Sequence, residues 1–520
     1  MSRSPRPCAD YLVVSPPVCS PSEPPSGAFL LAAALQARGR SVFLLDLSLE
    51  FYLRIFDRAG DGQVRRALDY LRGGSGRLTP QGHRTACGFL HSELSRESEK
   101  TGWKTTLMDL EPPCGCHSPS RILELCEQGP TPFAGLFEEV LDPVLDDLRP
   151  GTVLVSASYL SQLAGAVSTV RHVTSRGFGT ITGGSLLNSL RETGEGSIHL
   201  ERVLGRVEYG DGSILTGAGG EEPFLGSLSW PGTAGRTDYV SPLRVIPFAL
   251  STGCFWNRCL FCPDRTQPFR RIGPGSLASL LESAPSAEER TMVHLLDSAV
   301  PPQFLSEALP VLEERNASFY GFARPSADLL GGDLLERAAQ SGCAMLQYGV
   351  ESADGRILGR FCKGIDPDTA AAVLERTAGL GIRTYAYFLF GLPGEDRESR
   401  EKTAAFVENN LDSIDFANFS VFNLPVRCEL ADRAADFGIE PDGSHADEGI
   451  VRFYLPFSMS GGSPRFEVRR FLSGASTAGS GVRAVLNRTP KWFRASHMAM
   501  MDMDGRTPCQ NRGLSSENAR

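Results

Sequence analysis

The stretch Cys254-Phe-Trp-Asn-Arg-Cys259-Leu-Phe-Cys262 sets three cysteines in the spacing C-x4-C-x2-C. It follows residues 245–251 (VIPFALS), an apolar run with the length of a buried strand. Three thiolates on one loop can hold three irons of a [4Fe–4S] cluster and leave the fourth iron open to another ligand. A zinc site is the alternative, although zinc usually takes four protein ligands. Cys254, Cys259 and Cys262 are therefore the predicted metal ligands.

The cysteine loop opens a regular alternation of strand and helix patterns. Such alternation forms a parallel sheet, and in barrels of this kind the carboxyl ends of the strands carry the chemistry. The alternation covers residues 243–425, which is too short for a complete eight-stranded barrel of roughly 250 residues. We therefore expect a partial (βα)6 TIM-like barrel. The predicted strands are 245–251, 291–297, 317–323, 344–350, 382–390 and 414–422, with helices at 275–285, 303–315, 328–341, 367–380 and 397–410.

Residues 8–215 show the same alternation with one interruption. A polar stretch at about 50–130 predicts an insertion with some helix near 64–71. The remainder predicts a doubly wound, Rossmann-like α/β domain, whose ligands would lie beyond the carboxyl ends of the strands. The predicted strands are 10–15, 41–46, 152–157 and 177–182, with helices at 27–38, 132–148 and 161–175.

Two further segments complete the predicted domain organisation. Residues 216–242 are rich in Gly, Pro and Ser and predict a linker. Residues 426–520 predict a C-terminal extension, with helix at 465–503 and a partly disordered tail from residue 507.

Composition bounds the class of protein. An odd count of 13 cysteines in 520 residues is no disulfide framework of a small secreted chain. The net charge of −9 excludes a general attraction to nucleic acid or anionic membranes. No apolar run reaches the roughly 18–20 residues of a membrane span, and the first residues lack a secretory signal. We expect a cytoplasmic protein with no membrane span and no nucleic-acid partner.

Other cysteines are weaker candidates. Cys114-Gly-Cys116-His117 has metal-binding residue types, but its polar, Pro-flanked context favours ordinary loop thiols. Cys343 and Cys362 flank the fourth barrel strand, where the first fits a core thiol and the second is a candidate to face the site.

The barrel segment resembles the radical S-adenosylmethionine (SAM) superfamily. That family's usual motif is C-x3-C-x2-C with an aromatic residue before the last cysteine, a position that Phe261 fills here. The first gap is one residue longer than usual. Further family-like residues follow in order at the strand ends: Leu295-Leu-Asp297, Arg324, Tyr348-Gly-Val-Glu-Ser352, Cys362-Lys-Gly364 and Phe390-Gly-Leu-Pro-Gly-Glu395.

The resemblance implies that SAM binds the open iron of a [4Fe–4S] cluster and is cleaved reductively. The products would be methionine and a 5′-deoxyadenosyl radical that removes a hydrogen from the substrate. A flavodoxin or ferredoxin would supply the electron. The implied catalytic residues are Glu351, as a partner of the polar groups of SAM, and Arg324, as a counter-charge to its carboxylate. Further implied cofactor contacts are Phe261, Gly349, Ser352, Gly391 and Gly394.

Simpler structural roles stay open for several of these residues. Arg324 and Glu351 could form a salt bridge at the top of the barrel. Gly391 and Gly394 could serve only a turn. For Asp297, a helix N-cap is as plausible as a ligand contact.

The order of the two domains resembles the cobalamin-dependent class of this superfamily. The matching residues are Ser15-Pro-Pro17, the helix at 27–35, Asp46, Val153-Leu-Val-Ser-Ala157 and Gly183-Gly-Ser185. The resemblance implies a bound cobalamin, with the corrin or its nucleotide tail lined by Ser156, Ser158, Gly183 and Gly184. The motif Asp-x-His-x-x-Gly is absent, so the cobalt would have no histidine ligand from it.

The favoured function is cobalamin-dependent methyl transfer to an unactivated carbon or to phosphorus. The substrate would be a small molecule or a peptide. One alternative is a radical SAM enzyme of other chemistry, such as ring formation, rearrangement or peptide modification, without functional cobalamin. The other is a non-catalytic Fe–S protein.

Overall fold

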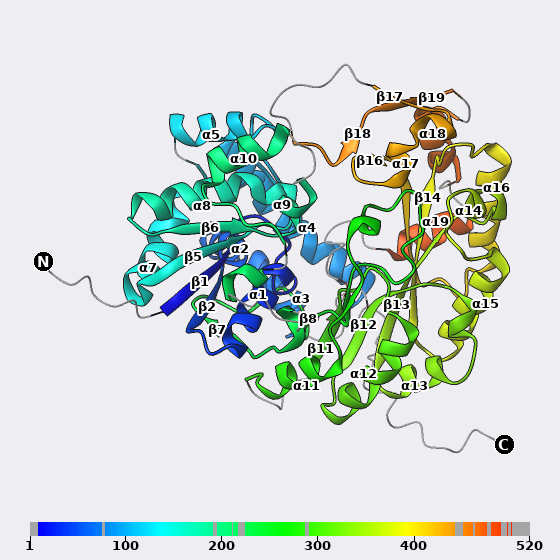
Figure 1. The fold of residues 1–520 in the computed structure, drawn as a ribbon, viewed down its shortest axis with the longest axis horizontal. Helices are drawn as coiled ribbons and strands as arrows, with labels where there is room; N and C mark the ends of the chain where they lie inside the picture. The colour runs from blue at the N-terminus through cyan, green and yellow to red at the C-terminus, as the bar shows by residue number, and fades with distance from the viewer. Residues whose placement is uncertain are drawn as a thin grey trace, which may run out of the picture.

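Two parallel β-sheets, one in each half of the chain, form the centre of the protein (Figure 1). The computed structural model describes residues 9–74, 78–129, 131–190, 195–210, 212–216, 224–285, 291–442, 451–460, 463–475, 480–489, 497 and 501. The expected tail from residue 507 lies outside the described residues. No helix in the described part has both the length and the apolar character that a membrane crossing requires.

The first sheet contains β1 (Ala9–Ser15), β2 (Val42–Asp46), β5 (Pro150–Ser156), β6 (Thr180–Gly183) and β7 (Gly232–Thr233), in the order β6-β5-β1-β2-β7. β1 pairs in parallel with β2 on one side and with β5 on the other. The strand order therefore reverses at β1, and such a switch point leaves a crevice beyond the carboxyl ends.

Helices cover both faces of this sheet, as the sequence pattern predicts. Helix α1 (Ser26–Ala37) packs on the face that carries Val13. Helix α8 (Leu163–Ser175) packs on the opposite face with Leu12 and Val14. Successive side chains of β1 thus point to opposite faces of the sheet. Helices cover both faces, and this explains why the sequence of β1 is a continuous apolar run.

Two segments differ from the sequence expectation. β7 comes from the expected linker and pairs in parallel with β2, so this part of residues 216–242 extends the sheet. The expected insertion at 50–130 is mainly helical. It contains α2 (Leu47–Arg58), α3 (Gly62–Leu71), α4 (Pro80–Thr101), β3 (Lys104–Thr105), β4 (Leu110–Glu111) and α5 (Pro119–Gln128).

Helix α4 shows why the pattern was hidden. Its buried apolar residues, including Cys87, Leu90 and Leu94, make a narrow stripe in a helix of 22 mostly polar residues. This stripe joins the same apolar core as the first sheet. The helices of residues 50–130 are therefore an integral layer of the first domain.

The second sheet is a partial barrel. Its strands are β8 (Arg244–Phe248), β11 (Thr291–Leu295), β12 (Ser318–Ala323), β13 (Cys343–Glu351), β14 (Arg383–Phe390) and β15 (Phe416–Val421). Each strand pairs in parallel with the next along the chain, and β8 and β15 are the two edges, so the barrel is open. Between them lie α11 (Pro274–Glu282), α12 (Pro302–Glu314), α13 (Leu334–Gln340), α15 (Pro367–Gly379) and α16 (Arg397–Asn409).

Alternate residues of the barrel strands face two different environments. Val293, Phe319 and Leu346 share one core with apolar residues of the covering helices. Their neighbours Met292, Tyr320 and Met345 belong to a separate cluster on the inner face. By the same alternation His294, Arg324, Gln347 and Glu351 also face inward.

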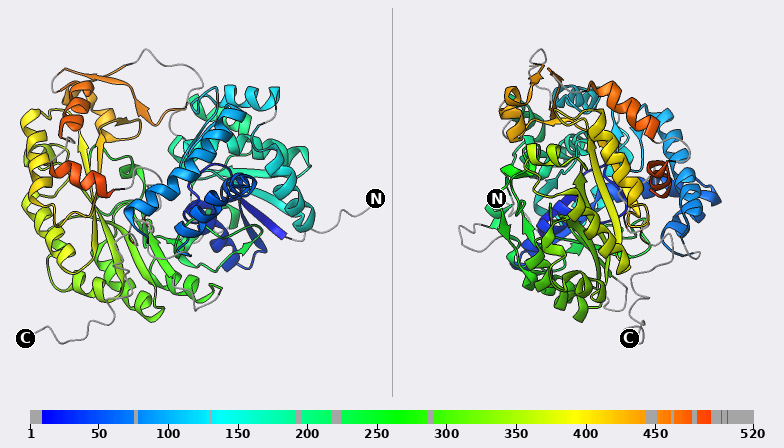
Figure 2. Two further views of the ribbon diagram at one scale, coloured as in Figure 1. Left: turned by 180° about the vertical axis from the view of Figure 1, so that it is seen from behind. Right: turned by 90° about the vertical axis from the view of Figure 1, so that its right-hand side faces the viewer.

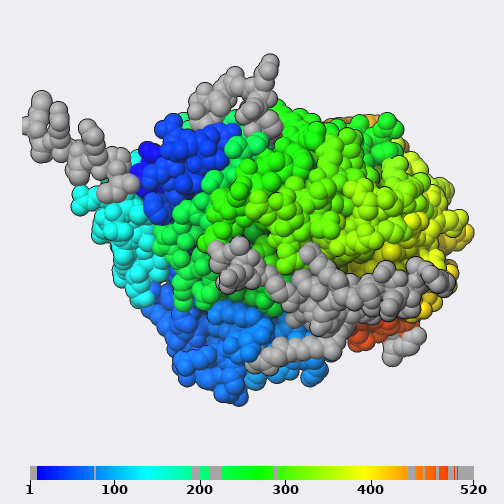
Figure 3. All heavy atoms as spheres, turned by 90° about the horizontal axis from the view of Figure 1, so that it is seen from below, coloured from blue at the N-terminus to red at the C-terminus, as the bar shows by residue number. Residues whose placement is uncertain are grey.

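The two domains share a continuous core. Helix α1 of the first domain belongs to one apolar cluster with Ile246 of β8 and Leu277 of α11. Glu23, on the loop after β1, reaches the inner face of the barrel. Its carboxylate accepts hydrogen bonds from Tyr320 Oη and His294 Nδ1, each at 3.0 Å. Figures 2 and 3 show the elements of both halves adjoining.

The remaining elements surround these two sheets. In place of one helix over 465–503, the described residues form α18 (Arg465–Ala475) and α19 (Gly481–Arg488). The others are α6 (Ala134–Leu136), α7 (Asp142–Leu148), α9 (Ser185–Leu190), α10 (Glu195–Leu204), β9 (Ser251–Thr252), β10 (Arg270–Arg271), α14 (Gly355–Arg360), β16 (Leu424–Pro425), α17 (Glu429–Asp432), β17 (Ile439–Pro441), β18 (Tyr454–Leu455) and β19 (Phe457–Met459).

Candidate active site

The cysteine loop is anchored at the carboxyl end of β8. Asp297, just after β11, accepts hydrogen bonds from Leu250 N at 2.9 Å and Ser251 Oγ at 2.6 Å. Asp297 therefore fixes the chain directly before the loop. The N-cap expectation is wrong, since α12 is preceded by Pro301, and the ligand contact stays a prediction. Burial raises the pKa of this carboxyl group.

The three cysteines are free thiols, and each is partly exposed. Burial, followed by the nearby Asp264, raises the pKa of Cys262 to about 12. Burial also raises the pKa of Cys259, although the cations of Lys363 and Arg324 act against it. Iron ligation would have to offset this cost, because the thiolate is the form that binds metal.

The donor set fits a cluster better than a single ion. Within the described ranges, no three or more His, Cys, Asp or Glu side chains gather as the ligands of one metal ion. The three cysteines alone would leave a zinc ion one ligand short of its usual four. A [4Fe–4S] cluster is different, because each cysteine binds a different iron.

Trp256, inside the longer first gap of the motif, ties the loop to the barrel. Its Nε1 donates to Cys362 O at 2.9 Å, and the Arg324 guanidinium lies 4.2 Å from its ring centroid. Gly364 has φ +68°, and a Cβ there would lie 1.8 Å from an indole atom of Trp256. Only glycine leaves room for this ring. The sequence interpretation did not single out Trp256, and the extra residue in the gap was the available signal.

Glu351 and Arg324 both lie beside the loop but do not pair with each other. Lys363 Nζ donates to Glu351 Oε1 at 2.8 Å, in an ion pair with side chains 11% and 16% exposed. Arg324 donates to Lys363 O at 2.6 Å and to Gly364 O at 3.2 Å. The expected alternative of an Arg324–Glu351 salt bridge is therefore wrong. Lys363 is a site residue that the sequence interpretation left without a role.

Burial and neighbouring charges shift the pKa values of the two cations beside the loop, Arg324 and Lys363. Burial lowers the pKa of Arg324. For Lys363, burial alone acts downward, but Glu351 and Cys259 outweigh it, and its pKa lies above the ordinary value. A Cβ on Gly349 would lie 2.8 Å from Glu351 Oε1 and 2.9 Å from Lys363 Nζ. Gly349 thus leaves space for the pair.

Other predicted cofactor contacts have structural partners. Ser352 is fully buried, and its Oγ accepts from Asp354 N at 3.1 Å. Phe261 packs against Phe361 with ring centroids 6.2 Å apart. Their contacts with SAM stay predictions.

The turn with Gly391 and Gly394 lies beneath α18. Both glycines have φ +83°, and a Cβ on Gly391 would lie 3.3 Å from Val468. Gly391 N donates to the Glu395 carboxylate, and burial raises the pKa of Glu395 to about 7. A turn thus explains the glycines, and their approach to SAM stays a prediction.

Glu395→Gln should reduce the pH dependence of stability. Because the pKa rises from 4.5 to about 7, the folded protein keeps a proton here that the unfolded chain has lost within this window. Stability therefore falls as pH rises through the window and levels off above it. Glutamine can still accept a hydrogen bond from Gly391 N. We therefore expect the free energy of unfolding of the variant, relative to that of the unmodified protein, to be higher at about pH 8 than at about pH 5 by on the order of 1–3 kcal/mol. Urea unfolding at both pH values measures this. The exposed Glu398→Gln is the control, and identical slopes in all three proteins would refute the prediction.

A crevice lies at the expected edge of the first sheet. It has a volume of about 220 Å³, and Ser156, Gly183 and Gly184 line it together with Gly27 of α1. A Cβ on Gly27 would lie 3.1 Å from Ser158 Oγ and 3.2 Å from Ser156 Oγ. Three of the four residues predicted for cobalamin thus line one pocket, and the fourth is adjacent. The apolar part of the lining comprises Leu30, Leu31, Leu154, Val155, Ile181, Leu215, Phe224 and Leu225.

Two glycines in the wall of the crevice pack closely against neighbouring backbone. Gly184 has φ +116°, and a Cβ there would lie 2.2 Å from Ala157 O. A Cβ on Gly183 would lie 3.1 Å from Glu208 O. Asp46, which carried part of the resemblance, instead caps α2 through Ser48 N and Leu49 N, and burial raises its pKa to about 6.

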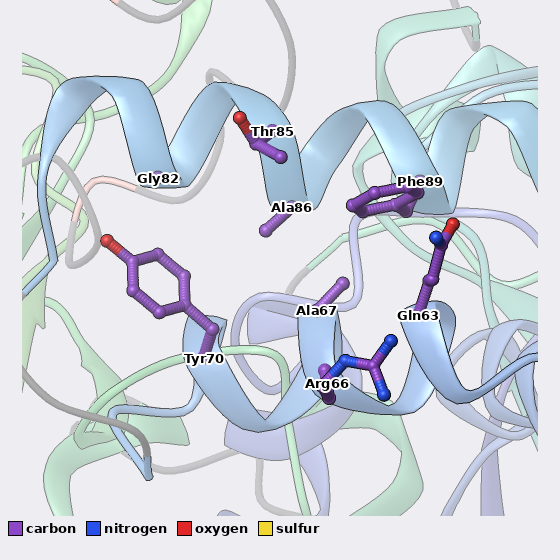
Figure 4. A pocket seen from close by; sticks show the side chains of 8 residues that line it. All are labelled: Gln63, Arg66, Ala67, Tyr70, Gly82, Thr85, Ala86 and Phe89. Carbon is purple, nitrogen blue, oxygen red and sulfur yellow. The ribbon is translucent and has the colours of Figure 1, made fainter.

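Two other candidates do not join this site. A groove of about 430 Å³ lies between α3 and α4, and Figure 4 shows its lining with Arg66, Tyr70 and Phe89. It contains none of the predicted site residues. In the Cys114-Gly-Cys116-His117 segment, His117 Nδ1 donates to Val451 O at 2.9 Å and Cys116 donates to Leu110 O. These contacts support ordinary structural roles.

The chain has the fold of cobalamin-dependent radical SAM enzymes. No family model matches it. The chain is similar to OxsB, a cobalamin-dependent S-adenosylmethionine radical enzyme solved with aqua-cobalamin, with a TM-score of 0.53, 12% identity, and coverage of 90% of this chain and 66% of OxsB.

A second solved structure of this fold is TsrM from Kitasatospora setae, a radical S-adenosylmethionine methyltransferase with cobalamin and a [4Fe–4S] cluster bound. The TM-score is 0.50 at 14% identity, and the match covers 92% of this chain and 90% of TsrM. Another TsrM structure contains tryptophan as substrate and a SAM analogue. The predicted resemblance is confirmed at the level of fold.

A curated relative is an uncharacterized methyltransferase of Pyrococcus horikoshii. It is 25% identical over 190 residues, which are 34% of this chain and 39% of the relative. The match therefore spans about two fifths of that protein, and OxsB is also matched over less than two thirds of its length.

Proposed function

We propose that this protein is a radical SAM enzyme that uses cobalamin to transfer a methyl group. The observation that carries the proposal is a contact between the first domain and the inner face of the barrel. The loop after β1, at the crevice edge of the first sheet, places Glu23 on the inner face of the barrel whose first loop bears the three cysteines. Groups held at the two places would border one interior.

The chain's own residues have distinct tasks in this proposal. Cys254, Cys259 and Cys262 would hold a [4Fe–4S] cluster, which supplies the electron for reductive cleavage of SAM. Glu351, fixed by Lys363, would accept hydrogen bonds from the polar groups of SAM. Arg324 would add positive charge beside its carboxylate. Arg324 and Glu351 both face inward, so they would orient SAM toward the interior.

The first domain would hold cobalamin, which supplies the methyl group. Ser156, Gly183 and Gly184 would line it in the crevice at the switch point of the sheet. Methyl transfer is also the activity in the names of TsrM and of the curated relative. The substrate class is a small molecule or a peptide, and the tryptophan bound by TsrM is one candidate to test.

The decisive experiment follows both halves of the reaction. The protein is reconstituted with iron and sulfide without oxygen, loaded with cobalamin and given a reductant, SAM with a deuterated methyl group, and candidate substrates. The proposal expects 5′-deoxyadenosine and a product that carries the label. Formation of 5′-deoxyadenosine with an unmethylated product would favour radical chemistry of another kind, as the likeness to OxsB allows.

Gly27→Leu should weaken cobalamin binding at least about tenfold. The new side chain would point toward Ser156 and Ser158 and fill the crevice. Equilibrium dialysis with hydroxocobalamin, followed by its visible absorbance, measures the affinity. Gly129→Leu is the matched control, because nothing lies within 4 Å of a Cβ at that position. If the Gly27→Leu protein bound cobalamin with unchanged affinity, the assignment of cobalamin to this crevice would be wrong.

A further inference from the structure

One short segment contacts both candidate sites, and we call residues 424–432 the strap. It contains β16 and α17, after the last strand of the barrel (Figure 1). Its final part contacts the cysteine loop. Leu430 N donates a hydrogen bond to Leu260 O at 2.9 Å, and Glu429 forms an ion pair with Arg265. Since Leu260 lies between the second and third cysteines, the strap holds the loop directly beside two predicted ligands.

The contact between the strap and the loop is buried. Leu260 is 5% exposed and Leu430 is fully buried, and both belong to one apolar cluster with Leu424 and Phe361. Leu260 N in turn donates to Phe361 O at 3.1 Å. Separation of the loop from the strap would leave buried backbone groups without hydrogen-bond partners, which is unfavourable. The loop and the strap should therefore move together.

Arg427 of the strap reaches the crevice of the first domain. Its Nη1 donates to Asn188 O at 2.6 Å. The Asn188 carboxamide pairs with both backbone groups of Gly210, because Nδ2 donates to Gly210 O at 2.8 Å and Oδ1 accepts from Gly210 N at 2.7 Å. Asn188 and Gly210 both line the crevice. The strap is thus bonded to the wall of the crevice through one side chain and to the cysteine loop through its backbone.

A second contact fixes the strap against the first domain. Val426 N donates to Phe453 O at 2.9 Å, and β16 pairs with β18 in antiparallel fashion. Before β18, Val451 exchanges two hydrogen bonds with His117. Val451 N donates to His117 O at 2.7 Å, and His117 Nδ1 donates to Val451 O at 2.9 Å. The strand next to the strap is therefore also held by the first domain.

We propose that Arg427 is a positioning residue that couples the crevice to the cysteine loop. This rests on the proposed function, which assigns cobalamin to the crevice and a cluster to the loop. A group that orders Asn188 and Gly210 in the crevice wall also fixes Arg427. The strap extends this order to Leu260, so the ordering cost for the second group is smaller. Coupling between two sites is reciprocal, so cobalamin and the cluster should strengthen each other's binding by the same factor.

The first test measures cobalamin affinity with and without the cluster. In the unmodified protein, hydroxocobalamin should bind at least about fivefold more tightly to the cluster-loaded chain, since coupling between sites usually amounts to about 5- to 150-fold. Arg427→Met keeps an aliphatic side chain but cannot donate to Asn188 O, so this affinity ratio should fall to about one. Arg427→Lys can still donate and should restore most of the ratio. Anaerobic equilibrium dialysis provides the affinities.

Hydrogen–deuterium exchange tests the same link without either cofactor. In the chain that holds neither group, Arg427→Met should raise amide exchange about threefold or more at the crevice wall (186–189) and also at the cysteine loop (256–262). A purely local role of Arg427 would change exchange at the crevice wall alone. Asn188→Ala breaks the link from the other side, since it removes the carboxamide pair with Gly210. Should Arg427→Met fail to fold, Asn188→Ala decides the outcome by the same two measurements.

Arg488→Met is the matched control. Arg488 also donates to backbone carbonyls, those of Leu411 and Ile414 at 3.2 Å each, and these carbonyls belong to neither site. The control should keep the affinity ratio and the exchange rates of the unmodified protein. Equal cobalamin affinity with and without the cluster in the unmodified protein, an unchanged ratio in Arg427→Met, or unchanged exchange in the cysteine loop would overturn the proposal.

The proposed function has a separate criterion. Failure of the unmodified, cluster-loaded protein to bind cobalamin would refute the cobalamin part of that function. Exchange at the two places in the cofactor-free chain would still decide whether Arg427 links them.

Discussion

Replacing Cys259 with alanine is expected to reduce 5′-deoxyadenosine formation to background. Cys259 is the middle predicted ligand of the C-x4-C-x2-C loop, and the charges of Lys363, Arg324 and Cys254 act on its thiol. Loss of one of three ligands should lower reconstituted iron from about four to fewer than about two atoms per chain. Iron analysis, visible absorbance and product chromatography measure the loss.

The matched control for this variant is Cys126→Ala. Cys126 is also a partly exposed free thiol, but its Sγ contacts Ser168 Oγ in the first domain. The control should keep full iron content and full SAM cleavage. If Cys259→Ala retained full iron content and full SAM cleavage, the cluster assignment would be wrong. The likeness to radical SAM enzymes would then be limited to the fold.

The second large effect is expected when one partner of the Glu351–Lys363 pair is removed. Lys363→Met leaves the Glu351 carboxylate in a site only 16% exposed without its cation. The free energy of unfolding should fall on the order of 2–4 kcal/mol, below the full cost for a completely buried pair. The double variant Glu351→Gln/Lys363→Met removes both charges and should recover at least half of this loss.

SAM binding separates the structural role of the pair from its proposed functional role. If Glu351 accepts from SAM, the double variant stays deficient in SAM cleavage although its stability returns. Calorimetric SAM titration and urea unfolding give the two readouts. Lys104→Met is the control, since its pair with Glu111 is exposed on both sides and its loss should leave stability almost unchanged. Full SAM cleavage in the double variant would contradict the assigned role of Glu351.

The sequence was most informative where a pattern is local. The six barrel strands and their helices occur where their periodicity predicts them, because each strand is buried on its helix-facing side and each helix carries an apolar stripe. Helix α4 was not recognised because its stripe is narrow within a polar sequence. β7 was missed because two residues of a Gly-rich segment carry no strand signal, and only pairing with β2 makes them a strand.

The sequence predicted the cysteine ligands of the candidate site but not the residues that hold the site in place. The cysteine spacing identifies Cys254, Cys259 and Cys262 without any knowledge of the fold. The partner of Glu351 could not be found this way, since Lys363 reaches it only after the chain passes through α14. The Trp256 ring needs a glycine at position 364, which is more than a hundred residues away in the sequence. No pattern in a single sequence reveals such a contact.

The continuous core between α1 and the barrel has a consequence for how this chain can be divided. Since Ala33 and Leu35 of α1 share one apolar cluster with Ile246 and Leu277, a cut between the halves would expose that surface on both pieces. The halves should thus unfold in a single transition, and neither should persist as a transplantable module. A chimera that exchanges one half at the Gly-rich junction should be destabilised unless both contact faces are exchanged together.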